Sequence, residues 1–131
     1  MSGFLDTNIL VYAYAEDAKR PIARALLDGR NRIGVQTINE FTLSARRKLR
    51  MSWHDIRQAL ELIESLTLKP VNLTYEIQRE GMRLAERYEL GVYDALHLAA
   101  ALSANCTIFW TEDLHNGLVI DDRLTIRNPF A

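Results

Sequence analysis

The sequence predicts an α/β fold in which short strands alternate with helices around a short, mostly parallel central sheet. Short apolar runs recur along the chain, and segments with apolar residues at helical spacing separate them. The chain has 131 residues and is 48% hydrophobic and 25% charged, which excludes a disordered or collagen-like protein. That length, without any linker or repeat, predicts one domain over residues 1–131.

The chain is expected to begin with a strand and two helical segments. Ser2 to Leu5 is a short apolar run that stops at Asp6, where we place the end of the first strand. The segment Asn8 to Tyr14 fits a strand or a helix equally well by periodicity. Pro21 suits the first turn of a short helix that ends at Gly29.

A strand and two longer helices are predicted next. Ile33 to Gln36 has the composition of a buried strand, and Thr37 then caps an amphipathic helix with Glu40 in its first turn. The spacing of Ser52 and Asp55 is that of a capping box, so a further helix is predicted to start there and to run through Leu66.

The remaining half continues the alternation of strands and helices. Ala95 to Ala104 is nearly all small and apolar, which indicates a helix packed closely inside the domain. The predicted elements are a strand over 70–73, a helix over 77–88 that Gly91 stops, a helix from Tyr93 through Ala104, a buried strand over 107–110 and a last strand over 124–127.

Charge and cysteine content narrow the function classes. Lys and Arg number 16 against 17 Asp and Glu, so no global positive field draws the protein to nucleic acid or anionic lipid. The single cysteine, Cys106, excludes an internal disulfide and a cysteine-based zinc site, and it is most simply a small buried residue. No apolar run is long enough to cross a membrane. We therefore expect a cytoplasmic protein without a membrane partner.

Four acidic residues stand at the ends of predicted elements: Asp6, Glu40, Asp94 and Asp113. Each has a structural explanation when it is taken alone. Asp6 and Asp94 can cap helices, Glu40 can favour a helix dipole, and Asp113 can form a turn. Ligands of open α/β sheets nevertheless bind outside the carboxyl ends of the strands, and all four acids can face that edge.

A cluster of four carboxylates needs positive charge. Two carboxylates about 5 Å apart repel by about 3 kcal/mol at an effective dielectric constant of about 20. Oxygen-only ligands suit Mg²⁺ or Mn²⁺ and disfavour zinc, and such an ion activates water and neutralises a phosphodiester oxygen. The pattern therefore indicates phosphodiester hydrolysis, with Thr7, Asn8 and Thr111 able to orient a carboxylate, a water or a phosphate.

Several other side chains allow two interpretations. His97 lies three residues after Asp94, so it is either a ligand in a mixed site or, as we favour, a hydrogen-bonded residue beneath it. His115 can contact RNA or protonate a leaving oxygen, but a surface position is the simpler reading, as it is for His54. A basic run is either a solvated helical face or an RNA-facing patch; it consists of Arg46, Arg47, Lys48 and Arg50. Four aromatic residues either stack on bases or pack internally; they are Phe41, Trp53, Tyr12 and Tyr14.

The same residues resemble the PIN-domain ribonucleases and, within them, the VapC-like toxins of toxin–antitoxin pairs. The resemblance spans nearly the whole chain. It rests on Asp6-Thr7-Asn8-Ile9-Leu10, Asn39-Glu40, Tyr93-Asp94-Ala95-Leu96-His97-Leu98-Ala99-Ala100-Ala101, Thr111-Glu112-Asp113-Leu114 and Asn128-Pro129-Phe130. Two positions depart from the usual pattern: Tyr93, where many relatives have Trp, and His97, where an apolar residue is more usual.

The resemblance implies a three-layer α/β/α fold and a Mg²⁺- or Mn²⁺-dependent endoribonuclease. It assigns both metal binding and catalysis to Asp6, Glu40, Asp94 and Asp113, with Thr111 as an accessory catalytic hydroxyl. It also implies a structured RNA substrate such as tRNA or ribosomal RNA, a cognate antitoxin that fills the active-site groove, and a homodimer.

Two other function classes compete with a nuclease toxin. A PIN fold without turnover would serve as a scaffold that binds RNA or protein. A receiver-like phospho-accepting domain also fits the length and the alternation, but such domains carry an acidic pair after the first strand and a late lysine. Here Thr7 follows Asp6, and no lysine follows residue 69.

Overall fold

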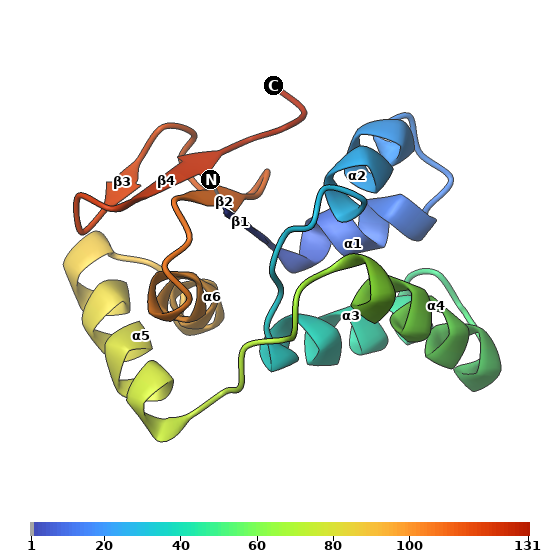
Figure 1. Ribbon diagram of the computed structural model, residues 1–131, viewed down its shortest axis with the longest axis horizontal. Coiled ribbons are helices and arrows are strands. Elements are labelled where there is room, and N and C mark those ends of the chain that lie inside the picture. The colour runs from blue at the N-terminus through green and yellow to red at the C-terminus, as the bar shows by residue number, and fades with distance from the viewer. Residues whose placement is uncertain (1) are drawn as a thin grey trace.

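A computed structural model describes residues 2–131, which form six helices and four short strands (Figure 1). In chain order these elements are β1 (Gly3–Leu5), α1 (Thr7–Tyr14), α2 (Arg20–Leu27), α3 (Val35–Arg47), α4 (Trp53–Leu66), α5 (Tyr75–Tyr88), α6 (Val92–Ser103), β2 (Ile108–Trp110), β3 (Val119–Ile120) and β4 (Leu124–Arg127).

The strands form one sheet in the order β1-β2-β4-β3. The β1–β2 and β2–β4 pairs are parallel, and the short β3 pairs with β4 in the antiparallel sense. Leu5 lies opposite Trp110, so the carboxyl ends of β1 and β2 are neighbours. The predicted mostly parallel sheet is therefore confirmed.

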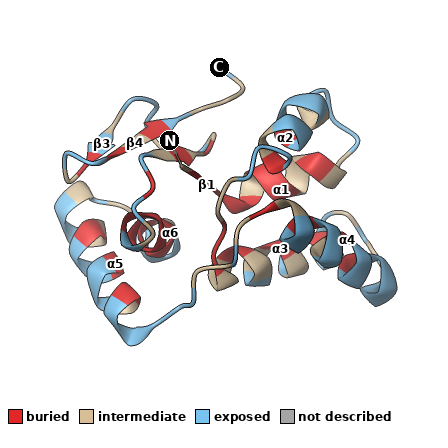
Figure 2. Cartoon of the chain, in the orientation of Figure 1, coloured by how far each residue is buried: buried red, intermediate tan, exposed pale blue. Residues whose placement is uncertain are grey.

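Alternation along β1 creates the three layers. Successive strand residues point to opposite faces of a sheet, and Phe4 and Leu5, both fully buried, enter two different hydrophobic clusters. The α5–α6 core joins Phe4 to buried residues of α5, α6 and β2–β4. The α1–α4 core joins Leu5 to buried residues of α1–α4. Helices cover both faces of the sheet, and buried residues concentrate where the helices face the sheet and one another (Figure 2).

Helix α6 is the most buried helix, as its small apolar residues predict. Every residue from Ala95 through Leu102 is buried. Helix α5 approaches it closely at Gly81, where an added Cβ would lie 2.8 Å from a methyl carbon of Leu96. Glycine at this position lets the two helices meet without displacing that side chain.

Two predicted strands are wrong in extent. The segments 33–36 and 70–73 contribute a single bridge to each other, between Gly34 and Val71, and Arg32, just before the first segment, forms another bridge with Phe4. Helix α3 already begins at Val35, because the Gly34 amide is bonded to Thr37 Oγ1 at 3.0 Å and the helical hydrogen bonds start at its carbonyl. The extended segment beside β1 is therefore too short to form a continuous ladder of hydrogen bonds.

Helix boundaries differ from the predictions at three places. Thr37 is the third residue of α3 rather than its cap, so Glu40 lies in the second turn. Helix α5 ends at Tyr88, its C-cap Glu89 adopts a left-handed conformation with φ 55°, and Gly91 is instead the N-cap of α6. The two-residue β3 was not predicted. The ambiguous segment 8–14 is helical, and Ser52 caps α4 as predicted, accepting from the Asp55 amide at 3.1 Å.

Within residues 2–131, none of the helices combines the length and the apolar character that crossing a membrane requires.

Candidate functional site

The predicted site residues converge at the carboxyl ends of two adjacent parallel strands. Asp6 follows β1, and Thr111 and Asp113 follow β2. The Asp6 amide donates to the Trp110 carbonyl at 3.0 Å, which continues the strand pairing by one residue and places Asp6 beside Thr111. This is the sheet edge at which ligands of α/β proteins bind.

Asp6 is buried, with 5% of its surface exposed, and both of its oxygens accept hydrogen bonds. Oδ1 accepts from the Thr7 amide at 2.7 Å, so Asp6 is also the N-cap of α1. Oδ2 accepts from the Thr111 hydroxyl at 2.7 Å. Burial raises the pKa of Asp6, although His97 and these two donors oppose the rise. The carboxylate is rigidly oriented and poorly solvated.

Thr111 connects three groups of the site. Its fully buried hydroxyl donates to Asp6 and accepts from the Asp113 amide at 3.0 Å and from Asn8 Nδ2 at 3.3 Å. Asn8 Nδ2 also donates to Asp113 Oδ2 at 3.0 Å. These contacts hold the Asp113 loop against the start of α1.

Glu40 enters the site from α3 and accepts three hydrogen bonds. Oε1 accepts from Thr7 Oγ1 at 2.9 Å and lies 2.9 Å from His97 Nε2, and Oε2 accepts from Gln36 Nε2 at 3.0 Å. Burial tends to raise the pKa of Glu40, but the contacts with His97, Gln36 and Thr7 together lower it below its ordinary value. Glu40 is therefore held in its charged form.

Asp94 reaches the site from the first turn of α6. Its carboxylate is half-buried and makes no hydrogen bond with any other residue in the range 2–131 that the structure describes. Burial raises the pKa of Asp94, and the negative charges of Asp113 and Glu40 add to this effect. Its surroundings therefore disfavour the charged form of the Asp94 carboxylate, and both of its oxygens are available to a ligand.

All four predicted acids line a single open cavity of about 550 Å³. Among the described residues, no Lys or Arg lies within 4 Å of any of these carboxylates, and His97 is the one side chain at ion-pair distance. Oxygen atoms of Asp6 and Glu40 and His97 Nε2 lie within 4.8 Å of one another. Asp94 and Asp113 lie outside this close group and share the cavity with it. The carboxylate oxygens of the cavity are hard donors of the kind that Mg²⁺ or Mn²⁺ prefers.

The geometry favours His97 as a hydrogen-bonded residue beneath the acids over His97 as a metal ligand. Its side chain is 2% exposed, and an ionised carboxylate can only accept, so the proton between His97 Nε2 and Glu40 belongs to the histidine. Nε2 then has no lone pair to offer a cation. His97 is the hydrogen-bonded residue beneath the acids, while His54 and His115 are exposed on the surface.

The aromatic and basic residues that were candidates for RNA contact differ in how exposed their side chains are. Phe41 is fully buried in the α1–α4 core and Tyr14 packs against its ring, so Phe41 is excluded from stacking on bases. Tyr12 lines the cavity, and Trp53 is 53% exposed with the Arg46 guanidinium over its ring. The basic residues 46, 47, 48 and 50 are exposed, and Lys48 is among the residues that line the cavity. Cys106 is buried, as expected.

Sequence reasoning missed two contributors to the site. Gln36 fixes Glu40 from the preceding turn of α3, and its spacing of four residues is the available signal. The second is a rim contact: Tyr12 donates to Glu112 Oε1 at 2.6 Å, and Lys19 Nζ lies 2.8 Å from Glu112 Oε2. No local pattern connects Lys19 to Glu112, because 93 residues separate them.

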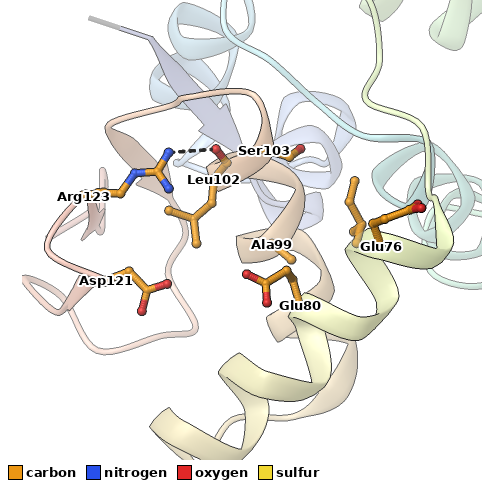
Figure 3. A pocket seen from close by; sticks show the side chains of 8 residues that line it. Glu76, Glu80, Ala99, Leu102, Ser103, Asp121 and Arg123 are labelled. Atoms are coloured by element: carbon orange, nitrogen blue, oxygen red, sulfur yellow. Dashed lines mark hydrogen bonds between the residues drawn. The ribbon is translucent and has the colours of Figure 1, made fainter.

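A second, smaller cavity of about 190 Å³ lies between α5, α6 and the β3–β4 turn (Figure 3). Arg123 borders it and donates to the Leu102 carbonyl at 3.2 Å, and Asp121 on its rim is already paired with Arg83. None of the four predicted acids lines this cavity, so its chemistry is separate from theirs.

Comparisons with known proteins agree with this architecture. A toxin–antitoxin complex from Klebsiella pneumoniae holds a chain that is 21% identical, with 98% of each chain covered and a TM-score of 0.74. The VapBC-1 structure from nontypeable Haemophilus influenzae gives 21% identity over 100% of both chains and a TM-score of 0.69. Mycobacterium tuberculosis VapC20, described as a sarcin-ricin-loop-cleaving toxin, gives 16% identity, coverage of 86% of this chain and 92% of that chain, and a TM-score of 0.67.

At these identities the structures establish a shared fold. No curated protein matches the sequence significantly. The family model described as PIN domain, however, matches residues 3–115, which include β1, all six helices, β2 and the four acids. A receiver-like domain is thereby excluded, and the expected three-layer α/β/α fold is confirmed. The chain belongs to the PIN domain family.

Proposed function

We propose that this protein is a divalent-metal-dependent endoribonuclease and the toxin of a toxin–antitoxin pair. The observation that carries the proposal is one cavity lined by Asp6, Glu40, Asp94 and Asp113, none of which has a Lys or Arg partner among residues 2–131. A protein keeps such a repulsive arrangement when a ligand supplies the missing positive charge.

In this proposal Asp6, Glu40, Asp94 and Asp113 hold Mg²⁺ or Mn²⁺ and Thr111 is an accessory catalytic hydroxyl. The bound ion supplies an activated water and neutralises charge on the phosphodiester. Thr111 keeps Asp6 in one orientation, and Thr7 and Gln36 do the same for Glu40. Asp94 has both oxygens available to the ion, since they accept no hydrogen bond from any residue in the range 2–131.

The relatives support RNA as the substrate and an antitoxin as the partner. One structural neighbour is described as a toxin that cleaves the sarcin-ricin loop, and several others are toxin–antitoxin complexes. We extend these properties to this chain and propose a structured RNA substrate, a cognate antitoxin, a homodimeric state and a cytoplasmic location. The fit of the fold over 98% of the first of these chains supports the extension.

The test is cleavage of total cellular RNA by the purified protein in Mg²⁺, in Mn²⁺ and in EDTA. Asp94→Asn, purified in parallel, controls for contaminating nucleases and keeps the size and shape of the side chain. Discrete products that require both metal and Asp94 would establish the nuclease, and mapping their ends would identify the target.

The competing interpretation is a PIN-fold scaffold that binds RNA without cutting it. Folded protein free of antitoxin that binds RNA in chelator, yet yields no products after addition of either metal, would favour the scaffold and contradict the proposal. The intact set of four acids in one cavity favours the nuclease.

A further inference from the structure

We propose that His97 is a positioning residue that fixes Glu40 of α3 relative to Asp94 of α6 and thereby sets the spacing of the four acids. This inference rests on the proposed function, because the spacing matters for a cation held between the two helices. His97 acts through Glu40 and contacts neither substrate nor ion.

The candidate site lies where two separately packed halves of the protein meet. Buried side chains of α3, such as Phe41, belong to the α1–α4 core, whereas those of α6, such as Leu98, belong to the α5–α6 core. Glu40 stands on the first half and Asp94 on the second. Beyond the β1 strand that both cores share, the Glu40–Asp94 distance therefore depends on the contacts that cross between α3 and α6.

One polar contact makes that crossing. The bond between His97 Nε2 and Glu40 Oε1, at 2.9 Å, is the one side-chain hydrogen bond between α3 and α6 among the described residues. The other two donors to Glu40 are Thr7 on α1 and Gln36 on α3, which both belong to the same half as Glu40. These donors orient the carboxylate but do not tie it to α6.

His97 itself is firmly anchored. It lies three residues after Asp94, so both side chains project from the same face of α6. The ring is 2% exposed, and Nδ1 is buried without a hydrogen-bond partner among residues 2–131, so Glu40 is the direct polar partner of the imidazole. Burial of a polar ring is costly unless a hydrogen bond offsets it, which favours a short and fixed contact.

The test measures Mn²⁺ binding by electron paramagnetic resonance, without RNA, for the full chain and its His97 variants. His97→Leu removes the donor, and we expect it to weaken Mn²⁺ binding by about 10- to 100-fold, the effect typical of residues that orient metal ligands. His97→Gln places an amide nitrogen near the position of Nε2, and we expect it to restore most of the affinity. His97→Asn is too short to reach Glu40 and is expected to behave like the leucine variant.

A matched control and a kinetic readout separate positioning from general structure. His54→Leu, an exposed histidine on α4, is expected to leave Mn²⁺ affinity unchanged. In the RNA cleavage assay, His97→Leu is expected to raise the Mn²⁺ concentration for half-maximal rate more than it lowers the rate at saturating Mn²⁺. If His97→Leu fails to fold, the comparison of the glutamine and asparagine variants gives the same test.

Three results would overturn the inference. Mn²⁺ affinity unchanged in folded His97→Leu would show that Glu40 needs no tether. Tighter Mn²⁺ binding would show that His97 competes with the ion as a counter-charge. Weakening by folded His97→Gln equal to that by His97→Leu would show that donation to Glu40 is not what matters. Failure of the unsubstituted protein to bind Mn²⁺ would instead contradict the proposed function itself.

Discussion

At the scale of single residues, the carboxylates of the candidate site are held mainly by hydroxyl and amide donors. Among residues 2–131, His97 is their one titratable partner, and despite its burial its pKa is raised by the hydrogen bond with Glu40 and the charges of the nearby acids. Asp6 depends on the Thr111 hydroxyl and the Thr7 amide, and Glu40 depends on Thr7, Gln36 and His97. Hydroxyl and amide donors fix the orientation of an anion without neutralising its charge. The negative potential of the cavity is thus preserved for a ligand.

Thr111→Val is expected to lower the free energy of unfolding in chelator by about 1–3 kcal/mol. Valine keeps the shape of the buried side chain but leaves Asp6 Oδ2 and the Asp113 amide without their partner. Urea unfolding measures the effect, with Thr107→Val, at the exposed residue that precedes β2, as the control. Equal, small changes in both variants would show that the Thr111 hydroxyl contributes no stability.

Asp94→Asn is expected to stabilise the metal-free protein at neutral pH while it removes RNA cleavage. Burial and the charge of Asp113 raise the pKa of Asp94 in the folded state, so ionisation of this group costs stability above its ordinary pKa. The advantage of the asparagine variant should therefore shrink as the pH falls and both proteins carry a neutral side chain. Thermal unfolding in EDTA from pH 7 down to pH 4 measures this trend, and a variant less stable than the original at pH 7 would refute it.

At the scale of elements, the sequence predicted helices more reliably than strands. Ser52 and the apolar spacing after it located α4, and the small residues after Asp94 identified α6 as a buried helix. The strand expected over 33–36 failed because an apolar run does not reveal whether a partner strand lies beside it. Here α3 begins at Val35, so the segment before it forms isolated bridges only. Arg32 pairs with Phe4, and Gly34 pairs with Val71.

Ser52→Ala is expected to destabilise the protein by about 1 kcal/mol, because the Asp55 amide at the start of α4 loses its side-chain acceptor. Ser65→Ala, near the exposed end of the same helix, is the control and is expected to cause no loss. Chemical denaturation of both variants distinguishes the cap from a general effect of removing serine. A loss as large for Ser65→Ala would contradict the role assigned to Ser52.

The β3–β4 turn is joined to α5 by an ion pair whose contribution should depend on pH. Asp121 accepts from Arg83 and Tyr88, and the Arg83 hydrogen bond lowers the pKa of the carboxyl below its ordinary value. A lowered pKa means that the stabilisation is complete above the unfolded pKa and is lost as the pH falls through the folded one. Asp121→Asn should be less stable than the original protein at pH 7, and the difference should disappear as the pH falls through the lowered pKa of Asp121.

The adjacent Asp122→Asn is the matched control for that experiment. Asp122 also has a positive φ, of 57°, and among the described residues it forms no ion pair. We expect its substitution to leave stability unchanged across the same pH range. A pH-independent difference between Asp121→Asn and the original protein would show that the charge of Asp121 is not what holds the turn.

At the scale of the whole molecule, the four acids come together because the chain folds into two cores on opposite faces of one sheet. The sequence indicated all four, since Asp6, Asp94 and Asp113 stand within three residues of an element boundary and Glu40 lies in the second turn of α3. It did not indicate that Gln36 orients Glu40 or that Glu40 meets His97, because those contacts depend on how α3 and α6 lie across the sheet. Local pattern thus predicts the residues of the site, and tertiary packing decides how each is held.

Binding of a divalent ion across the two halves should stabilise the whole protein. Mn²⁺ at 100 times its dissociation constant is expected to add about 2.7 kcal/mol to the free energy of unfolding. Asp94→Asn, which loses one of the four carboxylates, should gain much less at the same Mn²⁺ concentration. Urea unfolding with and without Mn²⁺ tests this expectation, and an equal gain in both proteins would place the ion elsewhere.

The most direct test of the central claim is anomalous X-ray diffraction from crystals of the protein soaked in Mn²⁺. We predict an anomalous peak inside the cavity, within coordination distance of carboxylate oxygens from Asp6, Glu40, Asp94 and Asp113. A cavity without a peak at saturating Mn²⁺, or a peak held by other residues alone, would contradict the assignment of these four acids as the metal site.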